Sequence, residues 1–305
     1  MKTFSTFEQQ IAHLETEKHL IFSDLSFAAE TLMRIGYFAL ISGYKGAFKN
    51  PMTGNYKDGV RFEEIVVLYE FDEQLRELFF HYILRIERHL RSLISYYFCQ
   101  KHGEQQAEYL NAANFTGSPK RANNVRTLIK ILDHLANGIS DYSYMIHHRG
   151  KYGNIPLWVL MSGVTFGSLA KFYDLGETDI RTKVSKHFIG VNETELGQFL
   201  SILTKFRNVC AHSERLFSYR TRNAITDMPL HAKMRIPRKG NQYIYGKKDL
   251  FAVVIAFRYL LPSAEFKTFK NALARTIRKY LANTAALTEA EMFGIIGFPS
   301  NWKSI

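Results

Sequence analysis

Residues 61–101 read RFEEIVVLYEFDEQLRELFFHYILRIERHLRSLISYYFCQK, and this stretch decides the fold class. It contains neither glycine nor proline, and its apolar residues recur at the spacing of an α-helix. Acidic residues gather near its start and basic residues near its end, as the helix dipole favours. We therefore predict one long helix here, or two helices that meet at a soft joint.

Helical spacing continues over most of the remaining sequence, which predicts an all-α fold. The exception is 220–248, where turn residues separate short β-prone pieces, so we expect an irregular or small hairpin insertion there. No internal repeat, proline-rich linker or low-complexity segment divides the chain. We predict a single helical domain over 1–305, with 1–55 as a semi-independent N-terminal lobe at most and 215–248 as a basic loop segment. The further predicted helices span 5–18, 26–48, 121–138, 156–174, 178–188, 193–212, 249–261, 263–282 and 287–294.

The composition is typical of a protein that is neither secreted nor embedded in a membrane. Of the 305 residues, 46% are hydrophobic, which is enough for a sizeable core. Mean hydropathy is −0.18, and no apolar run approaches the ~18 residues of a membrane span. The N-terminus is polar and lacks the apolar stretch of a secretory signal. The two cysteines, Cys99 and Cys210, form no disulfide framework, so we expect a cytoplasmic protein without membrane contact.

The net charge of +12 is concentrated in one segment. Residues 201–250 hold eleven basic residues against three acidic ones. A basic run is usually solvated surface, but acidic residues normally intersperse with the bases. An excess this large favours a polyanion such as RNA, because each neutralised phosphate releases counterions. The candidate RNA-binding residues are Lys205, Arg215, Arg220, Arg222, Lys233, Arg235, Arg238 and Lys239.

The basic region begins on the helix predicted over 193–212, which has a clear apolar stripe. Asn192 and Glu195 form a plausible capping pair at its start. Cys210 falls within the stripe, so we interpret it as a core residue and not as a nucleophile. The stripe consists of Leu196, Phe199, Leu200, Leu203, Phe206 and Cys210, and the opposite face carries Ser201, Lys205, Asn208 and His212.

Near the end of this helix, residues 206–220 read FRNVCAHSERLFSYR. Asn208 and His212 are four residues apart and therefore neighbours on the polar face. Arg207 lies at the margin of the apolar stripe, and its long side chain can reach round toward the same edge. An exposed structural histidine is the commoner explanation for a lone residue of this kind. The neighbouring amide, guanidinium and basic segment are what favour a site.

An arginine, an asparagine and a histidine in this arrangement can act on an RNA phosphodiester without a metal. Arginine neutralises and orients a phosphate through paired hydrogen bonds. Histidine, whose unperturbed pKa is near ~6.5, exchanges a proton at cellular pH. Asparagine can fix the imidazole tautomer or hold a phosphate oxygen.

The stretch RNVCAH, from Arg207 to His212, resembles the R-x4-H signature of HEPN-type ribonucleases. The wider sequence resembles the abortive-infection (Abi) family of the AbiD/AbiF type, and the similarity spans nearly the whole chain. The segments that carry it are RIGYFALISGYKGAFK (34–49), RIERHLRSLISYY (85–97), HHRGKYGNIPLWVLMSGVTFGSLAKFY (147–173) and RLFSYRTRNAITDMPLHAKM (215–234).

The resemblance implies an α-helical HEPN-type bundle with extra N-terminal helices, a homodimer, and RNA cleavage in anti-phage defence. Some members are associated with a small structured non-coding RNA, and the family is similar to the ancestor of the nuclease half-sites in RNA-guided type VI CRISPR effectors. By this resemblance Arg207 is a phosphate clamp, Asn208 its polar companion and His212 the proton-transfer residue. Many Abi relatives have a second histidine directly after the motif histidine. This chain has Ser213 there, so no role is carried over to that position.

The sequence favours neither a metal nor a small-molecule cofactor. The adjacent His147 and His148 diverge on a helix, and no zinc-type ligand spacing occurs. The glycines form neither of the common nucleotide-binding loops. We therefore expect no metal and no cofactor.

Three further groups of residues can be interpreted as structural or as functional. Glu70, Asp72 and Glu73 are expected to be solvated and not to bind a metal. Trp158 follows a proline typical of a helix start, and we expect it in the core. Three arginines of the long helix either form salt bridges with Glu87 and neighbouring acids or contact RNA: Arg85, Arg88 and Arg91.

The sequence as a whole predicts a metal-independent endoribonuclease of the HEPN type, with a composite site formed by two copies of the chain. The expected chemistry is attack by the RNA 2′-hydroxyl on the adjacent phosphate. The alternative is an RNA-binding protein that forms a complex with a small non-coding RNA and has weak or no nuclease activity. A helical scaffold is the third interpretation, and the basic segment argues against it.

Overall fold

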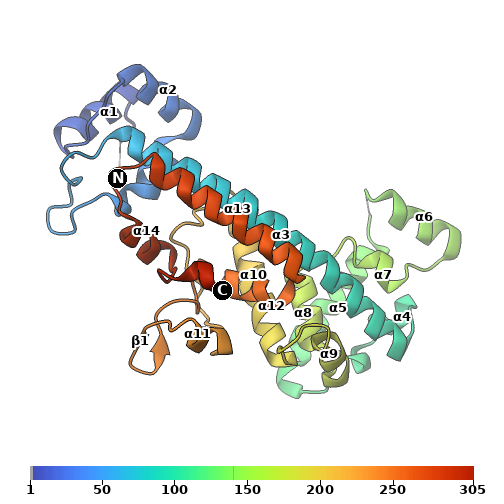
Figure 1. Cartoon of the computed structure of the whole chain (residues 1–305). Helices are drawn as coiled ribbons and strands as arrows, with labels where there is room; N and C mark the ends of the chain where they lie inside the picture. Colours follow the sequence, from blue (N-terminus) through green and yellow to red (C-terminus); the bar gives the residue numbers. More distant parts are fainter. Residues whose placement is uncertain (1–2, 140) are drawn as a thin grey trace.

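The computed structural model describes residues 3–139 and 141–305 and confirms the all-α class. Within these ranges the one sheet is a two-stranded hairpin. The other elements are arranged around α3 (Phe62–His102), which runs from the N-terminal helices to a second group of helices at the far end of the molecule (Figure 1). No helix in the described ranges has the length and apolar character needed to cross a membrane.

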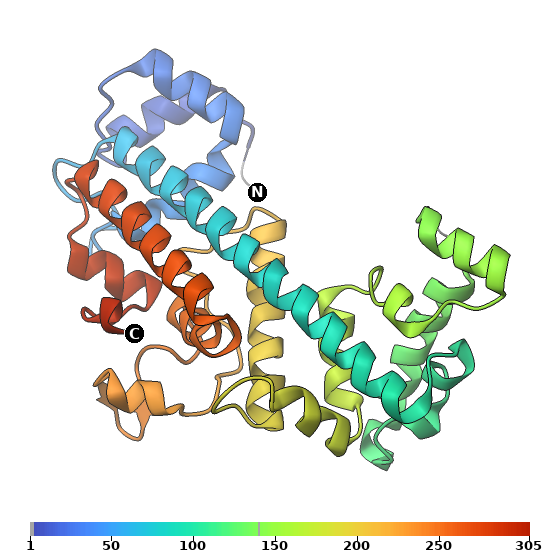
Figure 2. The ribbon, with the colours of Figure 1, turned by 45° about the vertical axis from the view of Figure 1, so that its right-hand side comes forward.

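The helix α3 is one continuous helix of 41 residues, so the first of the two predicted alternatives is confirmed. A helix of this length is held by the packing of its apolar face, since propensity alone contributes little. α13 (Ser263–Ala282) lies beside its first half, where Phe71 stacks on Tyr280. α10 (Glu193–Ala211) crosses its middle, and α9 (Thr178–Ser185) packs near its end (Figure 2).

Two short helices precede α3, namely α1 (Phe7–Thr16) and α2 (Leu25–Ile35). The helix predicted over 26–48 ends early, because Gly36 adopts a φ of 88° that favours glycine and breaks the helix. The chain then continues through a π-helical turn and a 3₁₀ turn, η1 (Phe38–Ser42) and η2 (Lys45–Ala47).

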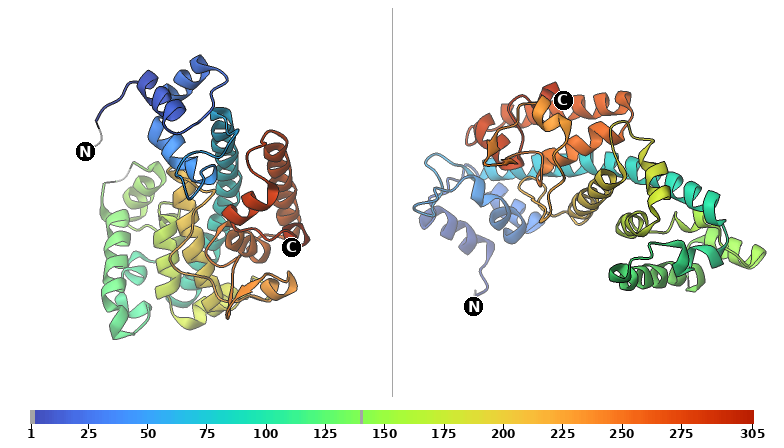
Figure 3. Two further views of the ribbon diagram at one scale, coloured as in Figure 1. Left: turned by 90° about the vertical axis from the view of Figure 1, so that its left-hand side faces the viewer. Right: turned by 90° about the horizontal axis from the view of Figure 1, so that it is seen from below.

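A second group of helices surrounds the far end of α3 (Figure 3). The helix predicted over 156–174 is in fact two helices, α7 (Leu157–Leu160) and α8 (Phe166–Leu175). A new helix begins because the Thr165 hydroxyl accepts a hydrogen bond from the Ser168 N–H. The sequence did not predict α6 (Ser143–Tyr152), in which only Met145 is buried, so an apolar stripe is missing. The remaining elements of this group are α4 (Gln106–Tyr109), η3 (Ala112–Asn114), η4 (Pro119–Arg121) and α5 (Ala122–Asn137).

The insertion expected at 220–248 contains a short helix, α11 (Pro229–Lys233), and the predicted hairpin. Its strands are antiparallel, with Arg238 opposite Tyr243 and Lys239 opposite Gln242. The bounds of the strands and of the C-terminal elements are β1 (Arg238–Lys239), β2 (Gln242–Tyr243), α12 (Leu250–Leu260), α14 (Glu289–Ile296) and η5 (Trp302–Ser304).

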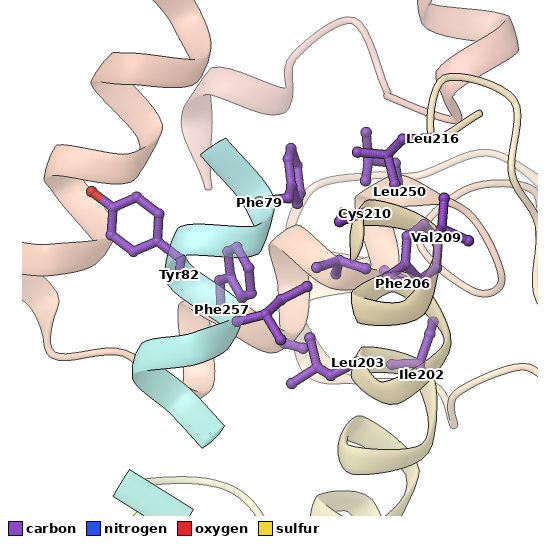
Figure 4. Close-up of a cluster of buried hydrophobic side chains, with 14 of the residues drawn as sticks. Phe79, Tyr82, Ile202, Leu203, Phe206, Val209, Cys210, Leu216, Leu250 and Phe257 are labelled. Atoms are coloured by element: carbon purple, nitrogen blue, oxygen red, sulfur yellow. The ribbon is translucent and has the colours of Figure 1, made fainter. Parts of the chain in front are cut away.

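Side chains from α3, α10 and α12 form the part of the core that lies against α10, the helix that carries the motif from Arg207 to His212 (Figure 4). Phe257 of α12 contacts Phe79 and Tyr82 of α3 at ring-centroid distances of 5.7 and 6.2 Å. Leu203 and Phe206 of α10 are fully buried in the same cluster. The core therefore fixes the orientation of α10, and with it the direction of each motif side chain.

Candidate functional site

The motif helix α10 begins at the predicted capping pair. The side chain of Asn192 accepts hydrogen bonds from the N–H groups of Thr194 and Glu195, both at 2.9 Å. The Glu195 carboxylate accepts in return from the Asn192 N–H at 2.9 Å. This reciprocal capping box satisfies N–H groups that the helix itself leaves free.

The apolar stripe of α10 is buried as predicted. Cys210 belongs to it, and burial raises the pKa of its thiol to about 12. The thiol therefore stays protonated at neutral pH and has little nucleophilic character. Its interpretation as a core residue is confirmed.

The three motif residues do not point the same way. Asn208 and His212 are exposed, and the backbone N–H of His212 caps the helix end by donating to the Asn208 carbonyl at 3.0 Å. Arg207 is half-buried and turns toward α3, where its guanidinium carbon lies 5.7 Å from the centroid of the Phe80 ring. No hydrogen bond or ion pair joins these three described side chains to one another. The expectation that Arg207 reaches round toward His212 does not hold within one chain, because the α3 side of the helix offers the guanidinium an aromatic face.

Arg207 lines a cleft of about 610 Å³ between α3, α7 and α10. Two other arginines share this cleft, and both come from α3. Nothing in the sequence places 85–97 beside 207, so the α3 arginines and Arg207 were not predicted to share a site. The cleft is lined by Leu84, Glu87, Arg88, Arg91, Ser92, Ser95, Trp158, Met161, Ser162 and Arg207.

Glu87 and Arg91 form an ion pair within the cleft. Burial raises the pKa of the Glu87 carboxyl, and the charges of Arg91 and Arg207 act in the opposite direction. Arg91 also donates to the carbonyls of Ser162 at 3.0 Å and Val164 at 2.6 Å. The salt-bridge interpretation is confirmed for Arg91 and for Arg85, which pairs with Glu265. Arg88 is exposed and forms no ion pair in the described residues, so contact with RNA stays a prediction for this residue.

Three polar atoms in this cleft are buried without a hydrogen-bond partner among the described residues. They are Oε2 of Glu87, Nε of Arg91 and Nε of Arg207. Buried polar atoms are normally satisfied, and those that are not require an explanation. A cluster of one acceptor and two donors in an open cleft indicates a site that water or a polar ligand completes.

Trp158 lies at this cleft with 52% of its surface exposed, so its prediction as a core residue is wrong. The reason is the shortness of α7, which begins after Pro156 and lasts one turn. Only Leu157 and Leu160 of this turn point inward, which leaves the indole at the surface.

The prediction that Asp72 is solvated is also wrong. Glu70 and Glu73 are exposed, as expected, but Asp72 is completely buried. Its spacing was the available signal, because Leu68, Asp72 and Leu75 follow one another on the buried face of α3.

The Asp72 carboxylate holds the segment that follows the motif. It accepts hydrogen bonds from the Tyr44 hydroxyl at 2.6 Å and from Arg76 at 2.9 Å. It also accepts from the backbone N–H groups of Leu216 and Phe217, at 3.1 and 2.6 Å. Asp72 thus joins the turn between η1 and η2, the helix α3 and the chain after His212, and so fixes the start of the basic segment.

The candidate RNA-binding residues fall into two groups. Three of them contact the protein itself: Arg215 donates to the Gly43 carbonyl at 2.6 Å, Arg220 donates to the Ile295 carbonyl at 2.6 Å, and Arg238 lies 4.1 Å from the Tyr243 ring centroid. The side chains of the other five are exposed and form no hydrogen bond or ion pair with described residues: Lys205, Arg222, Lys233, Arg235 and Lys239.

His231 is the one histidine of the basic segment that is fully buried. Its Nδ1 accepts from the Met228 N–H at 2.9 Å, and its Nε2 lies 2.9 Å from the Gly246 carbonyl. Nδ1 also lies 3.1 Å from the Met228 carbonyl, and Nε2, which faces only a carbonyl, is the donor. Burial lowers the pKa of His231, so this histidine has a structural role. No group of three or more potential metal ligands lies together in residues 3–139 and 141–305.

A family model described as Abi-like protein matches residues 30–218. The match extends from α2 through the motif helix α10 to the segment held by Asp72, which is well over half of the chain. No curated protein and no solved structure matches the chain. The chain belongs to the Abi-like protein family.

Proposed function

We propose that this protein binds RNA and cleaves it without a metal, as a HEPN-type ribonuclease acting in abortive infection. The observation that carries the proposal is the position of Arg207, in a cleft with Arg88 and Arg91, on the same helix that presents His212 to solvent. Membership of the Abi-like family supports the role in abortive infection. The exposed cations beside the motif supply the electrostatic attraction that RNA binding requires.

In the proposed reaction, the RNA 2′-oxygen attacks the adjacent phosphorus while the bond from phosphorus to the 5′-oxygen breaks. The 2′-hydroxyl gives its proton to a base, and the departing 5′-oxygen takes a proton from an acid. His212 is the residue of the motif whose side chain accepts or donates this proton. Arg207 neutralises the charge that develops on phosphorus oxygens, and Asn208 orients the imidazole or a phosphate oxygen. The products are a 2′,3′-cyclic phosphate and a 5′-hydroxyl.

The divergence of Arg207 and His212 favours a composite site made by two chains. In one chain the guanidinium lies against Phe80, whereas the imidazole is at the exposed end of the helix. A two-fold arrangement of motif helices brings the Arg207 of one copy toward the His212 of the other. It also removes the imidazole from bulk water, where electrostatic stabilisation is weak.

The test is incubation of the purified protein with total RNA in EDTA, beside Arg207→Ala and His212→Ala. We expect the wild-type protein to cleave and each variant to lose roughly 100-fold or more in rate, since general acid–base catalysis contributes about 10²–10⁴-fold. Circular dichroism should show unchanged folding, because neither side chain lies in the buried stripe. Ser201→Ala is the matched control, because Ser201 is exposed on the same face of the helix and is not a candidate RNA-binding residue. Cleavage that EDTA abolishes and magnesium restores would contradict the mechanism.

The second candidate function is RNA binding without cleavage, in a complex with a small non-coding RNA. The five exposed cations and the cleft donors without a hydrogen-bond partner favour this function as much as cleavage, because both groups can contact RNA phosphates in either case. The same experiment separates the two functions. Tight RNA binding by the wild-type protein and by His212→Ala, with no new RNA ends from either, identifies the binding function.

A further inference from the structure

The cleft between α3, α7 and α10 is lined by an acidic and an aromatic side chain as well as by arginines that can bind a phosphate. The acceptor without a hydrogen-bond partner, Oε2 of Glu87, belongs to a residue that is 4% exposed, and Glu87 lines the same cleft as Arg91 and Arg207, whose Nε atoms also have no partner. A phosphate can satisfy the arginines but is repelled by the carboxylate. The ligand that fits must therefore donate a hydrogen bond beside the point where it accepts one.

The aromatic ring at the cleft completes this pattern. Trp158 is half exposed, in contrast to Trp302, the other tryptophan, which is fully buried. An exposed indole ring offers a face on which the bases of single-stranded RNA stack readily. Leu84 and Met161 add further apolar surface to the same cleft.

We propose that this cleft binds one unstacked nucleotide of single-stranded RNA. The base stacks on Trp158, and its phosphate contacts Arg88. Because Oε2 of Glu87 and the Nε atoms of Arg91 and Arg207 are buried, these side chains turn toward the base, which then donates to the carboxylate and accepts from the Nε groups. The proposal rests on RNA being the ligand of this protein, as proposed above, and adds the part of the RNA that the cleft recognises.

Size and chemistry both agree with a nucleotide. A volume of about 610 Å³ lies in the middle of the range of roughly 300–1,000 Å³ that small-ligand sites occupy. Every RNA base has a donor next to an acceptor on its Watson–Crick edge, which is the arrangement that Glu87 and the arginines require. We therefore expect the cleft to accept all four bases, with stacking as the main contribution to affinity.

The cleft also explains how RNA is positioned for cleavage. Arg207 belongs both to the cleft and to the motif, so a base held on Trp158 places its neighbouring phosphate beside the motif helix. A duplex cannot enter in this way, because its bases are stacked and paired. The proposal therefore predicts selection of single strands over duplexes.

The experiment measures binding and uses the full-length His212→Ala protein, so that cleavage plays no part. Fluorescently labelled five-residue oligonucleotides of adenosine and of uridine are titrated by anisotropy, and tryptophan emission is recorded in parallel with unlabelled RNA. We expect both oligonucleotides to bind and to quench Trp158, while the buried Trp302 gives a constant background. Adding Trp158→Ala should weaken binding about tenfold or more and remove the quenching, whereas Trp158→Phe should keep most of the affinity.

Matched controls come from the opposite end of the molecule. Phe38 is an aromatic residue with 82% exposure, and Arg34 is an exposed arginine, both outside the cleft. Phe38→Ala and Arg34→Gln should leave the dissociation constant within about twofold. Arg88→Gln should weaken binding several-fold more than Arg34→Gln.

Several outcomes would overturn the proposal. One is binding by Trp158→Ala within twofold of its parent, and another is the absence of quenching. Equal affinity for a duplex of the same sequence would show that no unstacked base is needed. Tighter binding of adenosine or uridine monophosphate than of the oligonucleotides would assign the cleft to a free nucleotide. These results are independent of the cleavage assay, so either proposal can fail while the other holds.

Discussion

Asp72 shows how one buried side chain can position a site many residues away. Burial raises the pKa of Asp72, but all four of its hydrogen-bond partners are donors and one of them is the charged Arg76, which is the pattern that an ionised carboxylate accepts. Asp72→Ala removes the ion-pair partner of Arg76 and leaves the backbone N–H groups of Leu216 and Phe217 without their acceptor. We expect it to lower the free energy of unfolding by about 3–5 kcal/mol, measured by urea denaturation.

The neighbouring Glu73 provides the control for Asp72. It lies one position further along α3, is exposed and makes no ion pair in the described residues. Glu73→Ala should change the free energy of unfolding by less than about 0.5 kcal/mol. Similar losses from the two substitutions would show that Asp72 does not anchor the segment after the motif.

His231 gives the fold a dependence on pH. Because burial lowers its pKa, the unfolded chain binds a proton more readily than the folded one. Its contribution to stability is complete above pH ~6.5, the value of an unperturbed histidine, and is lost as pH falls below that value. His231→Gln, which keeps one donor and one acceptor, should lose less stability than the wild type between pH 7 and pH 5. Parallel losses in the two proteins, measured by urea denaturation, would contradict this role.

Single residues were predictable only where their environment is local. The exposure of Asn208 and His212 followed from the stripe of their own helix. The direction of Arg207 and the exposure of Trp158 did not, because they depend on Phe80 in α3 and on the length of α7. Asp72 was predictable in principle from its spacing, but its partners Leu216 and Phe217 are about 145 positions away in the sequence.

At the scale of elements, the basic segment differs from the uniform charged surface that its sequence indicates. Arg220 and Arg238 are engaged with the Ile295 carbonyl and the Tyr243 ring, whereas Arg222 and Arg235 are exposed and free of such contacts in the described structure. Contacts with RNA phosphates are therefore expected from the second pair. The first pair holds the segment in place.

This division predicts the salt dependence of RNA binding. Arg222→Gln combined with Arg235→Gln should reduce the slope of log affinity against log salt by about one for each lost phosphate contact. The fold should be unchanged. Arg34→Gln with Arg126→Gln, two exposed arginines outside the segment, is the matched control and should leave the slope as it was. An unchanged slope in the first double variant would make the segment ordinary solvated surface.

Element boundaries were predictable wherever the signal lies in the sequence of the element itself. The long helix α3, the capping box of α10 and the hairpin of the insertion all follow from local residue types. Gly36 and Thr165 are also local signals, and they divide two helices that apolar spacing alone joins. α6 was missed because it buries only Met145 and has no amphipathic pattern to detect.

At the scale of the whole molecule, α3 links the separate parts of the candidate site. Its first half carries Asp72, which holds the chain after the motif, and its middle carries the arginines of the cleft. Family membership and an all-α class were accessible from the sequence. The cleft was not, because it forms only when α3, α7 and α10 pack together.

The central claim is that RNA is cleaved by Arg207 of one copy and His212 of another. Mixing equal amounts of Arg207→Ala and His212→Ala protein tests it directly. Neither variant should cleave RNA alone in EDTA. If the copies exchange freely, roughly half of the dimers are mixed and each of these has one complete site, so the mixture should regain roughly a quarter of the wild-type rate. A mixture as inactive as its components, although the chains are shown to exchange and to bind RNA, would contradict the composite site.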